Sequence, residues 1–92
     1  MERNIYIVGA HSRARTLGVY LTKIYPDMKI EAYLYDNDEL NVANIEGVPV
    51  VRFDQDTSLH TQYPVYLGTR GVYHPVLTAK LKQMGMREII PV

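Results

Sequence analysis

The sequence predicts an α/β domain whose sheet is largely parallel and carries helices on both faces. Two observations lead to this prediction. Short apolar runs alternate with segments of helical periodicity along the chain, and the first of these runs breaks at Gly9 and turns within a few residues into a helical pattern. Such a strand–turn–helix start is typical of nucleotide-binding α/β units, where a helix N-terminus points free N–H groups at an anion.

Length and composition limit the domain organisation and the function. The 92 residues are enough for one core, and no repeat or linker divides them. Ten basic residues balance ten acidic ones, which argues against a nucleic-acid partner. No cysteine is present, so disulfides and thiolate metal sites are excluded. No apolar run approaches the roughly 20 residues of a membrane span, and no signal peptide opens the chain. We therefore expect a single cytoplasmic domain over residues 1–92.

The first strand and the first helix have the clearest signals. Residues 4–9 form a compact apolar run that predicts a strand. From Ser12 onward, apolar residues recur at the spacing of one helical face, and Pro26 ends the pattern. Gly18 lies on that face, where a missing side chain lets helix and sheet approach closely. The predicted buried face consists of Ala14, Leu17, Gly18, Leu21, Ile24 and Tyr25.

The middle of the chain predicts two more strands. Residues 29–35 alternate well enough for a second strand, which ends at the turn residues 36–38. Residues 39–47 have little helical periodicity and are expected to form an irregular crossover. Residues 48–53 predict a short third strand, and residues 54–63 are polar and loop-like.

The last third predicts a fourth strand, a second helix and a fifth strand. Residues 64–68 give the fourth strand, which is closed by Gly68-Thr69-Arg70-Gly71. Gly85 is a suitable residue to end the helix, and residues 87–92 form the last strand. Right-handed crossovers then give the strand order 3-2-1-4-5. The predicted buried face of the second helix consists of Tyr73, Val76, Leu77, Leu81 and Met84.

This topology predicts one ligand site. In such sheets the crevice lies at the carboxyl ends of strands 1 and 4, where the winding reverses. The loops 9–13 and 68–71 should meet there, with the end of the second strand beside them. The candidate ligand-binding residues are Gly9, Ala10, His11, Ser12, Arg13, Arg15, Asp36, Asn37, Gly68, Thr69 and Arg70.

The first turn matches the dinucleotide fingerprint only in part. The fingerprint needs Gly at three positions, which here hold Gly9, His11 and Ala14. His11, Arg13 and Arg15 place up to three cations at the positive end of the helix, where the dipole disfavours each cation by roughly 0.3–1 kcal/mol. Natural sequences prefer acidic residues in the first turn of a helix, so basic residues there indicate an anion site. Arginines that are paired elsewhere on the surface would also explain the pattern. Arg13 and Arg15 are about 200° apart around the helix, so both cannot face one crevice.

The other candidates each have two interpretations. Asp36 follows the second strand and could accept the hydroxyls of a ribose, or Asp36-Asn37-Asp38 could simply start a turn. Residues 68–71 could bind a phosphate or a sugar hydroxyl, or they could be an ordinary loop before a helix. The sequence has no nucleophile–base pair, P-loop or spacing typical of metal ligands. We therefore predict no catalytic residue and no metal site.

Several short motifs appear in a fixed order along the chain. They are Ile-Val-Gly-Ala (7–10), Tyr-Asp-Asn-Asp (35–38), Gly-Val-Pro-Val (47–50), Tyr-Leu-Gly-Thr-Arg (66–70) and Lys-Leu-Lys-Gln-Met-Gly (80–85). Together they resemble the N-terminal Rossmann-like domain of bacterial sugar acyltransferases of the sialic-acid O-acetyltransferase and PglD type. Similar modules also precede other surface-polysaccharide enzymes, including glycosyltransferases.

The resemblance implies a small Rossmann-like three-layer sandwich and a nucleotide-sugar site. It places Gly9 and Ala10 at the turn, Asp36 after strand 2, Gly68 after strand 4, and a basic residue at Arg15. The chain departs from the family at residues 11–13, where the family has a glycine-rich turn. The family's catalytic β-helix domain would follow residue 92, so residues 1–92 correspond to an N-terminal module.

Three functional hypotheses follow. The first is an accessory module that binds a nucleotide or a nucleotide-sugar, such as a UDP-sugar, for the catalytic domain of a transferase in polysaccharide biosynthesis. The second is an interaction or structural domain with a vestigial site. The third is a small regulator that binds NAD or coenzyme A, which requires room for a pyrophosphate beside His11.

Overall fold

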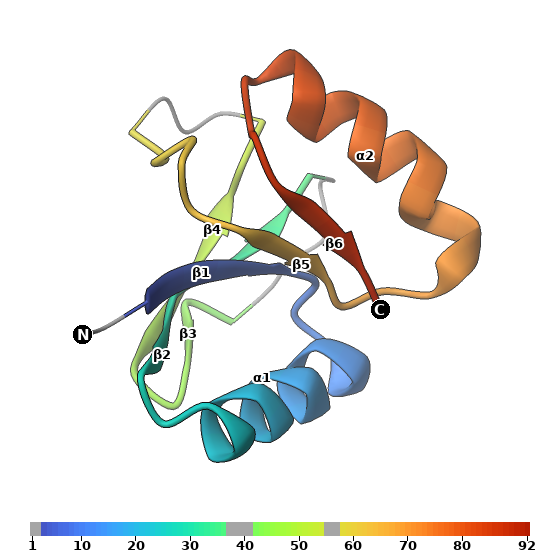
Figure 1. Cartoon of the computed structure of the whole chain (residues 1–92). Helices are drawn as coiled ribbons and strands as arrows, with labels where there is room; N and C mark the ends of the chain where they lie inside the picture. The colour runs from blue at the N-terminus through green and yellow to red at the C-terminus, as the bar shows by residue number, and fades with distance from the viewer. Residues whose placement is uncertain (1–2, 37–41, 55–57) are drawn as a thin grey trace.

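The computed structural model describes residues 3–36, 42–54 and 58–92. Within these residues the chain forms a six-stranded mixed sheet and two α-helices (Figure 1). The elements in chain order are β1 (Arg3–Val8), α1 (Ser12–Ile24), β2 (Met28–Tyr35), β3 (Asn44–Ile45), β4 (Val48–Arg52), β5 (Val65–Leu67), the 3₁₀ turn η1 (Gly71–Tyr73), α2 (His74–Gln83) and β6 (Ile89–Pro91).

The strand order is β3-β4-β2-β1-β5-β6. The five strands from β4 to β6 pair in parallel and have the order predicted from the sequence. Apolar runs that are buried on both faces favour this arrangement. The carboxyl ends of β1, β2 and β5 therefore lie next to one another at one edge of the sheet.

The predicted sheet of five parallel strands is incomplete at one edge, where a sixth strand, β3, pairs antiparallel with β4. Part of the expected irregular crossover over 39–47 is thus a hairpin strand; residues 39–41 lie outside the described residues. The two-residue turn between β3 and β4 has φ of 50° at Glu46 and 82° at Gly47. Two successive positive φ values match the right-handed twist of a hairpin, and this turn chemistry went unrecognised in the sequence.

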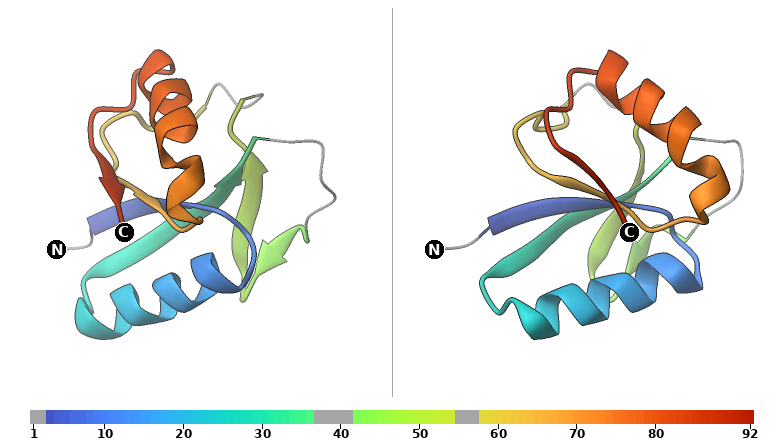
Figure 2. Two further views of the ribbon diagram at one scale, coloured as in Figure 1. Left: turned by 90° about the vertical axis from the view of Figure 1, so that its right-hand side faces the viewer. Right: turned by 45° about the vertical axis from the view of Figure 1, so that its right-hand side comes forward.

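The two helices cover opposite faces of the sheet (Figure 2). Successive residues of a strand point to opposite faces, so β1 supplies both sides of the core. Ile5 and Ile7 pack on the α1 side, and Tyr6 and Val8 pack on the α2 side. The α1 side is completed by Ala10, Ala14, Leu21, Met28, Tyr33 and Ile45, and the α2 side by Ala32, Leu34, Phe53, Val65, Leu67, Leu77, Leu81 and Met86.

Gly18 brings α1 close to the sheet, as its place on the apolar face predicts. A Cβ atom added at Gly18 would lie 2.3 Å from Tyr33 Oη and 3.0 Å from Ile30 Cδ1. The Tyr33 side chain is buried under the helix, and this burial raises the pKa of its phenol above the ordinary value. A larger residue at position 18 would push α1 off this support.

The buried face of α1 is narrower than predicted. Ala14, Gly18 and Leu21 are buried, whereas Ile24 and Tyr25 are 52% and 43% exposed. Tyr25 follows the helix and lies under the Arg3 guanidinium, 5.3 Å from ring centroid to Cζ. Helical periodicity predicts which helix positions are apolar, but it does not predict how many of them the sheet covers.

Candidate functional site

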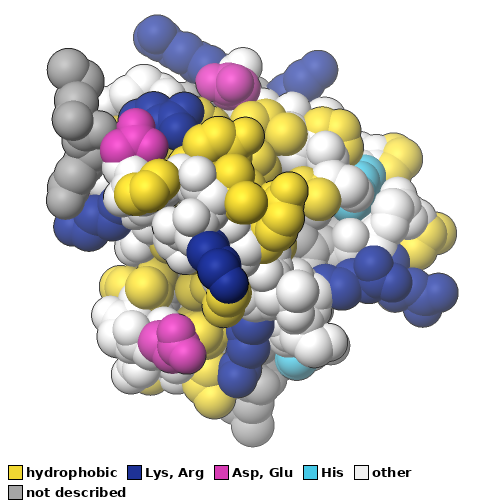
Figure 3. Space-filling view, turned by 60° about the horizontal axis from the view of Figure 1, so that its bottom comes forward, with side chains coloured by type: hydrophobic (Ala, Val, Ile, Leu, Met, Phe, Trp, Pro, Cys, Tyr) yellow, Lys and Arg dark blue, Asp and Glu magenta, His cyan; other side chains and the backbone are white. Residues whose placement is uncertain are grey.

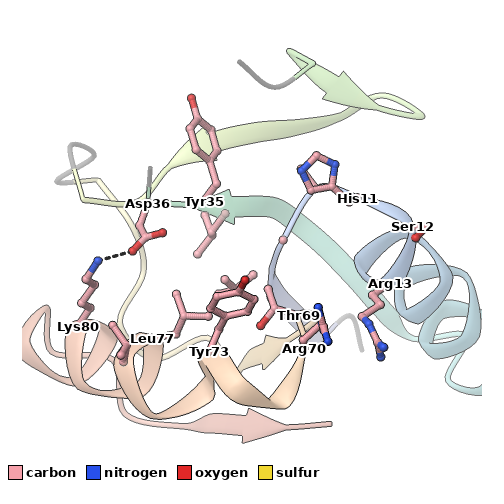
Figure 4. A pocket seen from close by; sticks show the side chains of 16 residues that line it. His11, Ser12, Arg13, Tyr35, Asp36, Thr69, Arg70, Tyr73, Leu77 and Lys80 are labelled. Atoms are coloured by element: carbon pink, nitrogen blue, oxygen red, sulfur yellow. Dashed lines mark hydrogen bonds and ion pairs between the residues drawn. The ribbon is translucent and has the colours of Figure 1, made fainter. Parts of the chain in front are cut away.

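A cavity of about 620 Å³ opens at the carboxyl ends of β1, β2 and β5 (Figure 4). Three segments that are distant in sequence meet in it: the turn after β1, Asp36 after β2 and the loop after β5. The winding of the sheet reverses at this point, which is where ligands bind in open α/β sheets. It is lined by Val8, Gly9, Ala10, His11, Ser12, Arg13, Leu34, Tyr35, Asp36, Gly68, Thr69, Arg70, Tyr73, Val76, Leu77 and Lys80.

Nine of the eleven candidate residues thus line one cavity. Arg15 does not line it, and its Nε donates a hydrogen bond to the carbonyl oxygen of Ala10 at 3.3 Å. Arg13 does line it, in keeping with the wide angle between the two arginines around the helix. Asn37 lies outside the described residues.

Backbone hydrogen bonds and close packing hold the turn after β1 against the end of β2 and against the loop after β5. Gly9 N donates to the Leu34 carbonyl oxygen at 2.7 Å, and Gly68 N donates to the Val8 carbonyl oxygen at 2.9 Å. Gly9 has φ of 118°, a conformation that favours glycine. A Cβ atom on Gly68 would lie 2.9 Å from the Cα atom of Ala14. No side chain larger than hydrogen fits at Gly68 unless the helix moves.

The N-terminus of α1 opens onto this cavity. Its N-cap residue His11 has extended backbone, with φ of −105° and ψ of −167°, and makes no side-chain capping hydrogen bond. The first turn holds no acidic residue, and Arg13 lines the cavity beside it. Backbone N–H groups without a side-chain cap, the positive helix end and a guanidinium together favour an anionic group. A phosphate or a carboxylate satisfies this arrangement.

The loop after β5 is ordered by two local contacts and contains one unsatisfied group. His74 Nε2 lies 3.1 Å from the Thr69 carbonyl oxygen, in position to donate a hydrogen bond, and Tyr73 N donates to the Arg70 carbonyl oxygen at 3.0 Å. The Thr69 hydroxyl is buried and has no hydrogen-bond partner in the described part of the chain. Leaving such a group unpaired costs about 1–3 kcal/mol. A ligand or a water molecule that reached this hydroxyl would recover part of that cost.

An ion pair joins the two remaining sides of the cavity. Lys80 Nζ on α2 lies 2.5 Å from Asp36 Oδ2 at the end of β2 (Figure 4). The Lys80 side chain is 49% exposed and the Asp36 side chain 19% exposed. A ligand hydroxyl that approaches Asp36 therefore shares the carboxylate with an ammonium group. This pair keeps a negative and a positive group at one end of the cavity.

The sequence did not predict the side chains that α2 contributes. Tyr73 and Val76 were expected on the buried face of the helix, but they are 55% and 59% exposed and line the cavity. Tyr73 lies in the 3₁₀ turn η1, which has fewer residues per turn than α2, so the α-helical spacing does not apply to it. A signal was nevertheless present, because Tyr73, Val76 and Lys80 are spaced by three and four residues and so share one flank of the helix.

Comparisons with known proteins do not add to this geometry: family models, curated protein sequences and solved structures all gave no match to the chain. Of the helices that the structure describes, none has the length and apolar character that a membrane crossing requires. Within residues 3–36, 42–54 and 58–92, no group of three or more His, Asp and Glu side chains is placed to hold a metal ion. The cavity itself is therefore the basis for a functional assignment.

Proposed function

We propose that this chain is a Rossmann-like module that binds a nucleotide or a nucleotide-sugar for a sugar-modifying transferase, without catalytic residues of its own. The observation that supports this proposal is the shared cavity of three loops at the N-terminus of α1. The order of the sequence motifs, which resembles bacterial sugar acyltransferases, points in the same direction. In a longer protein, a glycosyltransferase or acyltransferase domain would carry out the reaction.

Each part of the cavity has a counterpart in such a ligand. The uncapped N-terminus of α1 with Arg13 suits a diphosphate, and Arg70 offers a second guanidinium. Asp36 offers carboxylate oxygens to ribose hydroxyls. Tyr73 and Val76 are exposed and line the cavity, so they offer an apolar surface on which a base can pack. A volume of about 620 Å³ is within the usual range for small-molecule sites.

The test is calorimetry with UDP, UDP-glucose and UDP-N-acetylglucosamine. We expect saturable binding that Arg70→Ala weakens about tenfold, because a charge-assisted hydrogen bond to phosphate is lost. Arg87→Ala is the matched control, since it removes an arginine that is also exposed but does not line the cavity. Absence of heat with all three compounds at millimolar concentration would contradict the proposal.

One observation favours a second candidate, an interaction domain with a vestigial site. Tyr73 and Val76 line the cavity and Val72 precedes Tyr73; the side chains of Val72, Tyr73 and Val76 are 72%, 55% and 59% exposed. Exposed apolar side chains that gather in one place are typical of docking surfaces. This candidate predicts no binding in the same calorimetry. The third alternative, NAD or coenzyme A, is less favoured because His11 lines the cavity where the fingerprint has Gly.

A further inference from the structure

A second cavity of about 440 Å³ adjoins the first. Ser12, Arg13 and Thr69 line both cavities. These three residues, at the N-terminus of α1 and in the loop after β5, form the boundary between the two cavities, and we refer to them as the saddle. A ligand that contacts this saddle from the first cavity therefore has open space beyond it. The remaining residues that line the second cavity are Thr16, Leu17, Tyr20, Leu67 and Val92.

The second cavity lies on the α1 side of the sheet, next to β5 and β6. Tyr66 of β5 pairs with Ile90 of β6, and both side chains are half-buried. Tyr66 packs against the α1 side of the core. Val92, which follows β6, lines the second cavity. Figure 3 shows this side of the molecule, where hydrophobic side chains gather beside Lys and Arg side chains.

The lining combines an aromatic ring with several hydroxyl groups. Tyr20 is 59% exposed and lies above Leu17 by one helical turn. Ser12, Thr16 and Thr69 carry hydroxyls, each of which can donate and accept a hydrogen bond. A pyranose ring has the complementary chemistry, because its apolar C–H face packs on an aromatic ring while its hydroxyls bind polar neighbours. The unpartnered hydroxyl of Thr69 lies in the loop that both cavities share.

We propose that the second cavity holds the sugar ring of the nucleotide-sugar, while the nucleoside lies in the first cavity and the diphosphate crosses the saddle. This inference rests on the proposed function and extends it by naming the sugar subsite and its main contact, Tyr20. Arg13 lines both cavities and faces the diphosphate between them. A hexose with an uncharged ring is the expected ligand, because, among the described residues, the only charged side chain that lines the second cavity is Arg13, which is used by the diphosphate.

The experiment compares the binding of UDP and UDP-N-acetylglucosamine to the wild-type chain and to Tyr20→Ala. We expect the sugar to increase the affinity about fivefold to tenfold over UDP, and Tyr20→Ala to remove that increase while leaving UDP binding unchanged. Val19→Ala is the matched control: Val19 is on the same helix and also 59% exposed, but lines neither cavity. It should change neither affinity.

The outcomes separate this inference from the proposed function. If UDP binds but the sugar adds nothing, or if Tyr20→Ala weakens both ligands equally, the sugar subsite is refuted and the nucleotide site remains. If neither ligand binds at millimolar concentration, both proposals fail. Tyr20→Phe should retain the preference for the sugar, because it keeps the ring. Loss of the preference in Tyr20→Phe would refute stacking as the source of the affinity.

Discussion

The two walls of the first cavity are built in different ways. The backbone wall consists of Gly9 and Gly68, which pack against Ala14 of α1 with no room for a side chain. The side-chain wall consists of Asp36, Tyr73, Val76 and Lys80, whose side chains are half-buried or exposed. The first wall fixes the position of the N-terminus of α1 and of its backbone N–H groups, whereas the second can change its chemistry without changing the fold. We infer that the backbone wall anchors an anion and the side-chain wall selects the rest of the ligand.

The largest expected effect comes from filling the backbone wall. Gly68→Ala places a Cβ atom 2.9 Å from both Ala14 Cα and Ile7 Cγ2, so the structure must shift. We expect the free energy of unfolding to fall by about 1–3 kcal/mol, as for other overpacked sites. Urea denaturation measures this change.

Gly71→Ala is the control for that experiment, because a Cβ atom at Gly71 meets nothing within 4 Å. It should change the free energy of unfolding by less than about 0.5 kcal/mol. Equal losses in the two variants would mean that close packing does not distinguish the backbone wall.

A smaller effect is expected for the ion pair of the side-chain wall. A double-mutant cycle with Asp36→Asn and Lys80→Gln should give a coupling energy of about 0.2–1 kcal/mol, since half of the Lys80 side chain is exposed. The coupling should decrease as salt is added. A coupling energy above about 2 kcal/mol would show that this wall is also essential to the fold.

The smallest expected effect is on the pH dependence of stability, through the buried Tyr33 beneath α1. Burial raises the pKa of Tyr33, so its contribution is fully present below the unfolded pKa of about 10 and is lost as the pH rises through the folded pKa. The wild-type chain should therefore lose stability more steeply above pH 10 than Tyr33→Phe does. Chemical denaturation at pH 9 and above measures the two slopes. Identical slopes would show that ionisation of Tyr33 does not contribute to the loss of stability at high pH.

Much of the fold was predictable because its signals are local. Apolar runs, helical periodicity and breaks at Gly9, Pro26 and Gly68 gave five strands, two helices and the parallel strand order. The carboxyl ends of parallel strands meet at one edge of the sheet, and this rule predicts that Gly9, Asp36 and Gly68 lie together, as they do in the cavity. The turn at Glu46-Gly47 also carried a local signal, and it was not recognised.

Other features depended on the tertiary structure. Lys80 and Asp36 are 44 residues apart, and only the packing of α2 against the end of β2 brings them together. Tyr73, Val76 and Tyr20 are apolar positions whose exposure depends on how far the neighbouring elements extend. Among the residues that the structure describes, the sequence by itself therefore determined both helices, five of the six strands and their order, and the edge at which the cavity opens. The tertiary structure alone decided which side chains line the two cavities, because periodicity marks a face of a helix but not what covers it.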